Sequence, residues 1–556
     1  MGVLKGSWAV FLVVFILSGF LFFFRLGDRS LRNPDEGRYA EIAREMVIDG
    51  EWIEPHLYGA DYLKKPPLFY WLIAASFKVF GFNELAARLV PAFFGVLGVL
   101  ATFFFAKRIL GLKTAFFSAL ILTSNFWYLQ VGRYLLIDMV FSFFITAALY
   151  LFYLGVHETS LKKIYYLSFY ICIGLAFLAK GIAGFIIPVL SIFFYLIFTR
   201  RFLKVFREMR LLWGVLIFLA IVGPWLFKIF SLEPEFIKVF VLHEHFGRFL
   251  SDNFEHQEPW YYYVMILPLI LLPWTLFPWF FKRAFRFSKE EIRSDARLFL
   301  LISAASLFIF YSLSSSKLQT YMLPLVPLSA VFIGAAWHDR LEREGWSALS
   351  LRGAEIVLFL LLFAGISFIA ISSKYDAYFS RKFTEGVLFY LQLIAAALMT
   401  GTVVCLRAIK RQSKEGFFYA LIVMMCLVSV AFFSAMEKIN INYTTKHFAQ
   451  TLKPQLKKDG AVFIYGQPGA FYDFAFYLDA PIRVVGLEGE LELTRGDKED
   501  AVVSVTREEF FRMIGEGWKI YCLIRKSDFV DLDPGIRRRL TVMKEDARKI
   551  LFCANA

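Results

Sequence analysis

The chain is poor in charge and in cysteine, and each shortage excludes a class of protein. Charged residues are 19% of the 556 residues, against about 25% in typical soluble domains. Hydrophobic residues are 58% and the mean hydropathy is +0.58, which is too apolar for disorder, collagen or a set of soluble cores. The five cysteines have no CxxC or Cys/His spacing, so a disulfide-rich scaffold and a zinc finger are excluded. The composition therefore predicts a polytopic α-helical membrane protein.

The net charge of +14 is distributed unevenly along the chain. Residues 441–556 hold 18 Lys and Arg and 17 Asp and Glu, so nearly all of the excess lies in the apolar part. There it stands mostly in short basic loops between apolar runs, which is the positive-inside pattern of membrane proteins. We therefore assign the excess to topology and expect no nucleic-acid partner.

Thirteen segments are candidate spanning helices, because a span needs about 20 mostly apolar residues. They cover residues 8–24, 86–106, 114–131, 136–155, 164–180, 182–199, 211–230, 260–281, 298–313, 319–337, 353–372, 386–406 and 417–436. Basic residues follow every second segment, which places those loops and the N-terminus in the cytoplasm and the C-terminus outside. The first segment is not a cleavable signal peptide, because it has no small-x-small cleavage site.

The spans divide the chain into two predicted domains. Residues 1–436 form a transmembrane domain with outer loops at 25–85 and 231–259. Residues 437–556 are polar enough to form a small soluble α/β domain outside the cytoplasm. No glycine-rich phosphate loop and no catalytic group of its own occurs in this tail.

Local patterns predict the elements of the tail. Residues 461–465 and 518–524 have the apolar runs of buried strands. Residues 507–514 and 533–540 are predicted helices. A disulfide between Cys522 and Cys553 is left open.

The first outer loop carries two adjacent acids, Asp35 and Glu36, at the start of a predicted helix. Tyr39, Met46 and their apolar neighbours share one face over residues 36–49, which is typical of a helix that lies on the membrane surface. Asn33 or Asp35 can cap its start. The two acids are therefore either first-turn residues that match the helix dipole or members of a site.

Two lysines stand on the outer side, where the positive-inside rule predicts few. Lys64 and Lys65 precede Pro66 and Pro67, which fix the backbone and break a helix just before an apolar stretch. Binding of a lipid phosphate would explain the two charges. The structural alternative is snorkelling of both side chains to the membrane interface.

Other polar residues lie near the outer ends of predicted spans. Arg133 and Asp138 flank the start of the fourth span, where an acid is costly unless it faces water or a partner, and mutual pairing is the structural alternative. The remaining residues of this kind are His243, His245, Arg248, Lys317 and Tyr321. His243 and His245 are weak metal candidates, because no third ligand accompanies them.

At these positions the chain resembles membrane glycosyltransferases of the GT-C fold. The resemblance is greatest to the group that transfers 4-amino-4-deoxy-L-arabinose to lipid A, and protein O-mannosyltransferases are more distant. The stretches that carry it are Pro34 to Tyr39, Lys65 to Pro67, Ala87 to Leu89, Arg133 to Asp138, Pro259 to Tyr263, Pro273-Trp274 and Lys317 to Pro324. The tail resembles the small periplasmic α/β domain of the same group.

The resemblance implies a sugar donor linked to undecaprenyl phosphate and used at the periplasmic face of a bacterial inner membrane. It implies Asp35, Asp138 and Lys65 as catalytic residues. It places Arg38, Lys65, Arg248 and Tyr321 at the donor phosphate. The cavity residues would be Glu36, Tyr39, Tyr62, Arg133 and Lys317. No nucleotide cofactor is expected, and a divalent metal is left open.

Several alternatives stay open at this point. The acceptor is a lipid A phosphate or, alternatively, a protein or glycan hydroxyl, and the sugar is undetermined, with aminoarabinose as first candidate. A lipid transporter or flippase would also have many spans and a cationic lipid site. That class predicts internal repeats and charges at mid-membrane, whereas the polar residues here gather at one membrane face. The pattern favours an enzyme.

Overall fold

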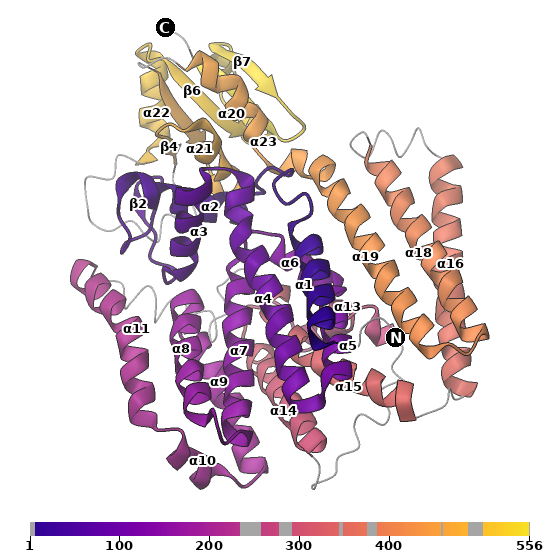
Figure 1. Cartoon of the computed structure of the whole chain (residues 1–556). Helices are drawn as coiled ribbons and strands as arrows, with labels where there is room; N and C mark the ends of the chain where they lie inside the picture. The colour runs from indigo at the N-terminus through magenta and orange to yellow at the C-terminus, as the bar shows by residue number, and fades with distance from the viewer. Residues whose placement is uncertain are drawn as a thin grey trace. The chain divides into compact units, whose positions relative to one another are not determined.

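The structure is a computed structural model that describes residues 6–233, 257–276, 292–343, 348–374, 386–456, 460–486 and 504–554 (Figure 1). His243, His245 and Arg248 lie outside the described residues. The chain forms two compact units. The first unit comprises Met1–Leu26 and Pro91–Met436, and the second comprises Gly27–Val90 and Glu437–Ala556. The second unit therefore joins the first outer loop to the tail, an association that the sequence did not predict.

The first unit is helical throughout its described part. Its helices are α1 (Ser7–Phe23), α5 (Leu112–Thr123), α6 (Phe126–Gly132), α7 (Ile137–His157), α8 (Lys162–Lys180), α9 (Ala183–Phe198), α10 (Phe202–Glu208), α11 (Leu211–Leu232), α13 (Tyr262–Ile270), α14 (Ile292–Ser312), α15 (Leu325–Arg343), α16 (Ala348–Lys374), α18 (Val387–Lys410) and α19 (Lys414–Ile439), with α4 (Glu84–Leu110) entering from the second unit. Two 3-10 turns, η2 (Trp274–Leu276) and η4 (Gln319–Met322), belong to it as well.

Seven of the described helices are long and apolar enough to cross a membrane, and shorter apolar helices accompany them. The predicted class, a polytopic helical membrane protein with a small C-terminal α/β domain, is therefore confirmed. The count of thirteen spans stays a prediction.

Three predicted spans are not single helices, and one of them, 319–337, is divided into η4 and α15. The segment 114–131 is divided into α5 and α6, because the side chain of Asn125 accepts a hydrogen bond from the backbone nitrogen of Tyr128, 2.8 Å away, and caps a new helix. In the described part of segment 260–281 the helix α13 ends after nine residues and the turn η2 follows. Pro268 and Pro273 explain the interruption, since neither can donate a backbone hydrogen bond.

The second unit contains a mixed sheet of six strands. The strand order is β5 (Ser504–Val505), β4 (Arg483–Val485), β3 (Ala461–Tyr465), β6 (Ile520–Arg525), β8 (Lys549–Ala554) and β7 (Leu540–Glu545). Strands β5, β4, β3 and β6 run parallel to one another, and β8 runs antiparallel to both β6 and β7. The helices of its C-terminal part are α20 (Lys446–Leu452), α21 (Asp473–Leu478), α22 (Arg507–Gly515), α23 (Lys526–Val530) and α24 (Pro534–Arg537).

Most elements predicted for the tail are confirmed. Strands β3 and β6 and helix α22 fall on or within two residues of their predicted ranges. The predicted helix 533–540 is wrong in its second half, because α24 ends at Arg537 and Leu540 begins β7, where pairing with β8 overrides the local helical pattern. Cys522 and Cys553 are buried on the adjacent strands β6 and β8.

The first outer loop supplies α2 (Asp35–Asp49), the hairpin strands β1 (His56–Leu57) and β2 (Ala60–Asp61), and α3 (Leu68–Phe80). The predicted helix over residues 36–49 is present, but it is not buried on its apolar face alone, because every residue from Glu36 to Met46 is buried. Helices α3 and α21 pack against it. The predicted capping is wrong as well, because Pro34 stands at the N-cap position and no side chain caps the helix.

Candidate functional site

Asp35 and Arg38 form an ion pair on the first turn of α2. The Arg38 guanidinium donates to Asp35 Oδ1 over 2.5 Å, and the Asp35 side chain is 45% exposed. Arg38 itself is buried and its guanidinium lies over the Tyr39 ring, 5.1 Å from the ring centroid. The pair therefore presents an accessible carboxylate beside a cation that its surroundings hold in place.

Glu36 is clamped from three directions within the second unit. Arg88 donates to both of its carboxylate oxygens at 2.8 Å, and Arg29 donates to Oε1 at 2.9 Å. The backbone nitrogen of Arg32 donates to Oε2. Glu36 is 1% exposed, so this acid fixes the start of α2. The adjacent acids thus have different environments, since only Asp35 is accessible.

Three tyrosines lie together in the second unit: Tyr39 on α2, Tyr62 in the loop before α3, and Tyr70 on α3. Tyr39 and Tyr62 are both buried, and each lies against the ring of Tyr70, with centroid separations of 6.0 and 6.5 Å. Lys65 is half-buried and Lys64 is buried, both in the loop that leads into α3. The unit thereby brings a predicted acid, predicted cations and predicted cavity tyrosines onto one structural element and its immediate neighbours.

Asn33, two residues before Asp35, is bonded to the tail. Its Oδ1 accepts from the backbone nitrogen of Asp473 at 3.0 Å, and its amide donates to the Asp473 carboxylate and to the Ala470 carbonyl. Thr444 and Thr445 donate to the same carboxylate at 2.7 Å. Burial raises the pKa of Asp473 above its usual value. This network fastens the entry to α2 to the C-terminal domain.

The first unit holds the other predicted acid, Asp138, in the first turn of α7. Lys180, the last residue of α8, forms an ion pair with the Asp138 carboxylate. The Lys180 ammonium also lies over the ring of Tyr321, 4.4 Å from its centroid, and Tyr321 packs on Tyr311. Helices α7 and α8 pack along each other, which brings the start of one helix to the end of the next.

Lys180 was missed in the sequence, although a signal was present. It stands at the outer end of the predicted span 164–180, where the positive-inside rule predicts few cations. The same argument singled out Lys65. The two side chains of the Asp138–Lys180 pair are only 10% and 12% exposed, so the lysine carries a buried charge at the end of an apolar helix.

Arg133 and Lys317, both predicted cavity residues, donate to backbone carbonyls. Arg133 binds the carbonyls of Leu21 and Phe22 at 2.7 and 2.8 Å, at the C-terminal end of α1, where carbonyls lack helical partners. Lys317 donates to the carbonyls of Glu258 and Ser314. Arg133 and Asp138 thus have different partners, and the alternative of a direct Arg133–Asp138 pair is not what the structure contains.

A group that could hold a metal ion lies on the β1–β2 hairpin. The ligand atoms of Glu54, His56 and Asp61 all lie within 4.8 Å of one another, and His56 Nε2 is 3.2 Å from Asp61 Oδ1. One imidazole and two carboxylates form a donor set that suits Zn²⁺ or Mn²⁺. Among the described residues, this is the one group of at least three possible metal ligands that lie this close together. The sequence did not single it out.

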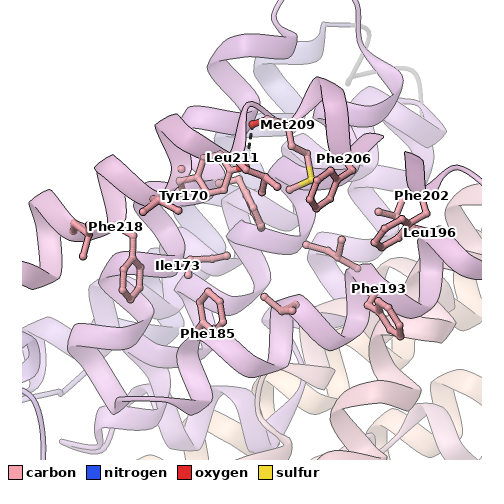
Figure 2. A pocket seen from close by; sticks show the side chains of 16 residues that line it. Tyr170, Ile173, Phe185, Phe193, Leu196, Phe202, Phe206, Met209, Leu211 and Phe218 are labelled. Carbon is pink, nitrogen blue, oxygen red and sulfur yellow. Dashed lines mark hydrogen bonds between the residues drawn. The ribbon is translucent and has the colours of Figure 1, made fainter. Parts of the chain in front are cut away.

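An apolar pocket of about 410 Å³ lies between α8, α9, α10 and α11 (Figure 2). Phenylalanines such as Phe185, Phe193 and Phe218 project into it, and the Tyr170 hydroxyl donates to the Met209 carbonyl at 3.0 Å. No charged side chain lines this pocket in the described part of the chain. It is therefore suited to hydrocarbon and not to a phosphate group.

Comparisons with known proteins identify relatives of the chain. A family model described as dolichyl-phosphate-mannose-protein mannosyltransferase matches residues 8–240. The undecaprenyl phosphate-alpha-4-amino-4-deoxy-L-arabinose arabinosyl transferase of Edwardsiella ictaluri is 34% identical over 355 residues, which are 63% of this chain and 62% of that protein. The match thus spans less than two thirds of that relative. The transferase of the same name, numbered 2, from Proteus mirabilis is 30% identical over 388 residues, which are 68% of each protein.

A solved structure has the same fold. The crystal structure of ArnT from Cupriavidus metallidurans bound to undecaprenyl phosphate aligns with a TM-score of 0.82 over 98% of both chains, at 24% sequence identity. The likeness therefore extends to both the helical part and the C-terminal domain.

Proposed function

Because the chain belongs to the family of undecaprenyl phosphate-alpha-4-amino-4-deoxy-L-arabinose arabinosyl transferases, we propose that it is a membrane glycosyltransferase that moves a sugar from an undecaprenyl-phosphate-linked donor to lipid A. The first candidate for the sugar is 4-amino-4-deoxy-L-arabinose. The observation that carries the proposal is the buried Asp138–Lys180 pair beside Tyr321, because a charge at this depth in an apolar unit is costly without a function or a partner.

The cations are assigned to the donor phosphate. In the second unit, Lys65 is a point charge and Arg38 offers a planar fork; in the first unit, Lys180 is a point charge. Each is suited to the charge that develops on a leaving phosphate. Tyr321 donates a hydrogen bond to the same group. Asp35 and Asp138 orient the sugar, or bind its amine.

The reaction is a single displacement at the anomeric carbon. An acceptor oxygen forms a bond to that carbon while the bond to the polyprenyl phosphate oxygen breaks, and the electron pair leaves with the phosphate. A lipid A phosphate is already anionic and needs no general base. For a hydroxyl acceptor, Asp35 is the base candidate, since it is the accessible acid in the first turn of α2.

The second candidate function is transfer to a protein or glycan hydroxyl. The match of residues 8–240 to the protein mannosyltransferase model favours it. The two candidates differ in their acceptor and share the donor chemistry. One acceptor experiment therefore separates them.

We also propose the orientation of the protein in the bacterial inner membrane. The basic loops support a cytoplasmic N-terminus and a periplasmic C-terminal domain. Single cysteines introduced at exposed positions of the tail should react with a membrane-impermeant maleimide in intact spheroplasts. Labelling of the tail only after lysis would reverse the orientation.

Divalent metal dependence is likewise a proposal. Glu54, His56 and Asp61 would hold the ion, and a bound metal would add positive charge to the first outer loop. Metal analysis of the purified protein, with a His56→Ala variant as comparison, tests the assignment. An unchanged metal content in the variant would remove it.

The proposed function is tested by reconstitution. Purified protein in liposomes receives the undecaprenyl-phosphate-linked aminoarabinose donor and lipid A, and mass spectrometry follows both released undecaprenyl phosphate and modified lipid A. We expect the two products in equal amounts. Dephosphorylated lipid A is the matched acceptor control, and transfer to it at the full rate would favour a hydroxyl acceptor.

A further inference from the structure

The second unit contains a pocket of about 450 Å³ beside the carboxyl ends of the neighbouring strands β3 and β6. Its lining includes Arg525, the last residue of β6, and Gly469 and Ala470, which follow β3. After β3 the chain forms β4 on one side of β3, and it later returns to form β6 on the other side of β3. In open α/β sheets such a reversal, outside the carboxyl ends of the strands, is where ligands bind.

The pocket is lined by four cations and by no carboxylate among the described residues. The cations are Arg525, Lys526, Arg548 and Lys549. Arg525 and Lys526 also contact the nearby acids Asp528 and Glu545, at 2.9 and 3.5 Å. Each of these contacts engages only part of the donor capacity of the cation.

Arg548 is the most available of the four cations. Its side chain is exposed and its guanidinium lies 5.0 Å from the centroid of the Tyr443 ring, and no described carboxylate forms a salt bridge with it. Lys549 is buried and donates to the Thr444 carbonyl at 3.1 Å. The pocket thus combines a fixed cation with an exposed fork, an arrangement that suits a phosphate group.

The pocket is joined to the start of α2. Asn33 and Pro34 line it and immediately precede Asp35. The hydrogen bonds between Asn33 and Asp473 hold this wall against the C-terminal domain. An anion in the pocket is therefore held at a defined position on the same rigid element that carries Asp35 and Arg38.

We propose that this pocket binds a phosphate group of the acceptor glycolipid, a different phosphate from the one that receives the sugar. The proposal rests on the proposed function, since it assumes a phosphorylated acceptor. The C-terminal domain then orients the acceptor head group toward α2. Its four cations select acceptors that carry a second negative group.

The kinetic test uses the full chain in liposomes and compares lipid A carrying two phosphates with lipid A carrying one. In Arg548→Gln we expect the KM for the two-phosphate acceptor to rise about tenfold, as for one lost charge-assisted hydrogen bond. The KM for the one-phosphate acceptor and for the donor should stay unchanged. Arg512→Gln, an exposed arginine of α22 outside the pocket lining, is the matched control. An unchanged KM, or equal rises for both acceptors, would overturn the proposal.

A binding test without donor separates this proposal from the proposed function. The full chain in nanodiscs is titrated with a bis-phosphorylated glucosamine disaccharide and, separately, with inorganic phosphate. We expect the disaccharide to bind and its Kd to weaken about tenfold in Arg548→Gln. Such binding without any transfer to lipid A would support the proposed phosphate-binding pocket and contradict the proposed function. If transfer occurs but the Kd of the disaccharide is unchanged in Arg548→Gln, the pocket is not an acceptor site. The same conclusion follows if binding depends on Arg548 but inorganic phosphate binds with the same Kd as the disaccharide.

Discussion

The ammonium group of Lys180 lies 4.4 Å from the centroid of the Tyr321 ring while it is paired with the carboxylate of Asp138. The pair connects the end of α8 to the start of α7, and both side chains are about nine-tenths buried. A buried ion pair adds little net stability, because desolvation offsets the attraction. Its presence is therefore better explained by a role in the reaction.

The pair leads to a prediction about Lys180→Met. Removal of the cation leaves Asp138 buried without its partner, so thermal unfolding in detergent should show a loss of roughly 3–5 kcal/mol. Release of undecaprenyl phosphate should fall about 100-fold, the effect of removing one electrostatic stabiliser of a transition state. The double variant Asp138→Asn with Lys180→Met should regain stability without regaining activity. Recovery of both would assign the pair a purely structural role.

The two adjacent acids of α2 should behave differently when neutralised. Asp35→Asn breaks an ion pair whose acid is 45% exposed, which costs about 1 kcal/mol, yet transfer should fall at least about 100-fold. Glu36→Gln removes the charge that two arginines surround and should cost roughly 3–5 kcal/mol of stability. Melting temperature and transfer rate, measured on the same preparations, separate the two effects. Full activity in a folded Asp35→Asn protein would remove Asp35 from the site.

Gly37 is required by the close approach of the tail. A Cβ atom at this position would overlap Asn33 Oδ1 and lie 2.5 Å from the backbone nitrogen of Asp473. Gly37→Ala should therefore destabilise the second unit by roughly 1–3 kcal/mol, as overpacking does. Gly515→Ala in α22 is the control, because nothing lies within 4 Å of its Cβ position. Equal unfolding temperatures of the two variants would contradict the observed packing.

Glu45 should make stability depend on pH. Burial, with a contribution from Glu41, raises the pKa of Glu45 from 4.5 to about 8. The native state then binds more protons than the unfolded state between these values, so this contribution to stability is complete below pH 4.5 and is lost as the pH rises through 8.

The measurement is the melting temperature between pH 5 and 9. We expect it to fall with rising pH in the wild-type protein and to change less in Glu45→Gln. Glu51→Gln, at an exposed position near the end of the same helix, is the control and should follow the wild type. Identical slopes for the wild type and Glu45→Gln would show that Glu45 titrates at its ordinary pKa.

Local sequence patterns predicted strands β3 and β6 and helix α22 of the tail, because burial of one apolar stripe or run determines them. They failed where distant residues decide the structure. Asn33 looked like a helix cap, but its partner Asp473 lies 440 residues away and no local pattern encodes that contact. For the same reason α2 looked one-sided, although residues of the tail cover it.

The predicted site was incomplete for a related reason. Asp138 was identified as a costly acid at the end of a span, but its partner Lys180 could be assigned only once α7 and α8 were known to pack together. Arg133 was ambiguous in sequence because an arginine can bind either a phosphate or free carbonyls. Only its position at the end of α1 shows which groups it contacts.

The contact between Asn33 and Asp473 also has a consequence for biosynthesis. The helix that carries Asp35 emerges from the ribosome early, while its partner in the tail follows 440 residues later. At about 5–20 residues per second, this interval is roughly 20–90 s. With the orientation proposed above, the first outer loop would during that time lie across the membrane without the domain that covers it, exposed to proteases and chaperones outside the cytoplasm. Truncation of the tail would prolong this exposure indefinitely.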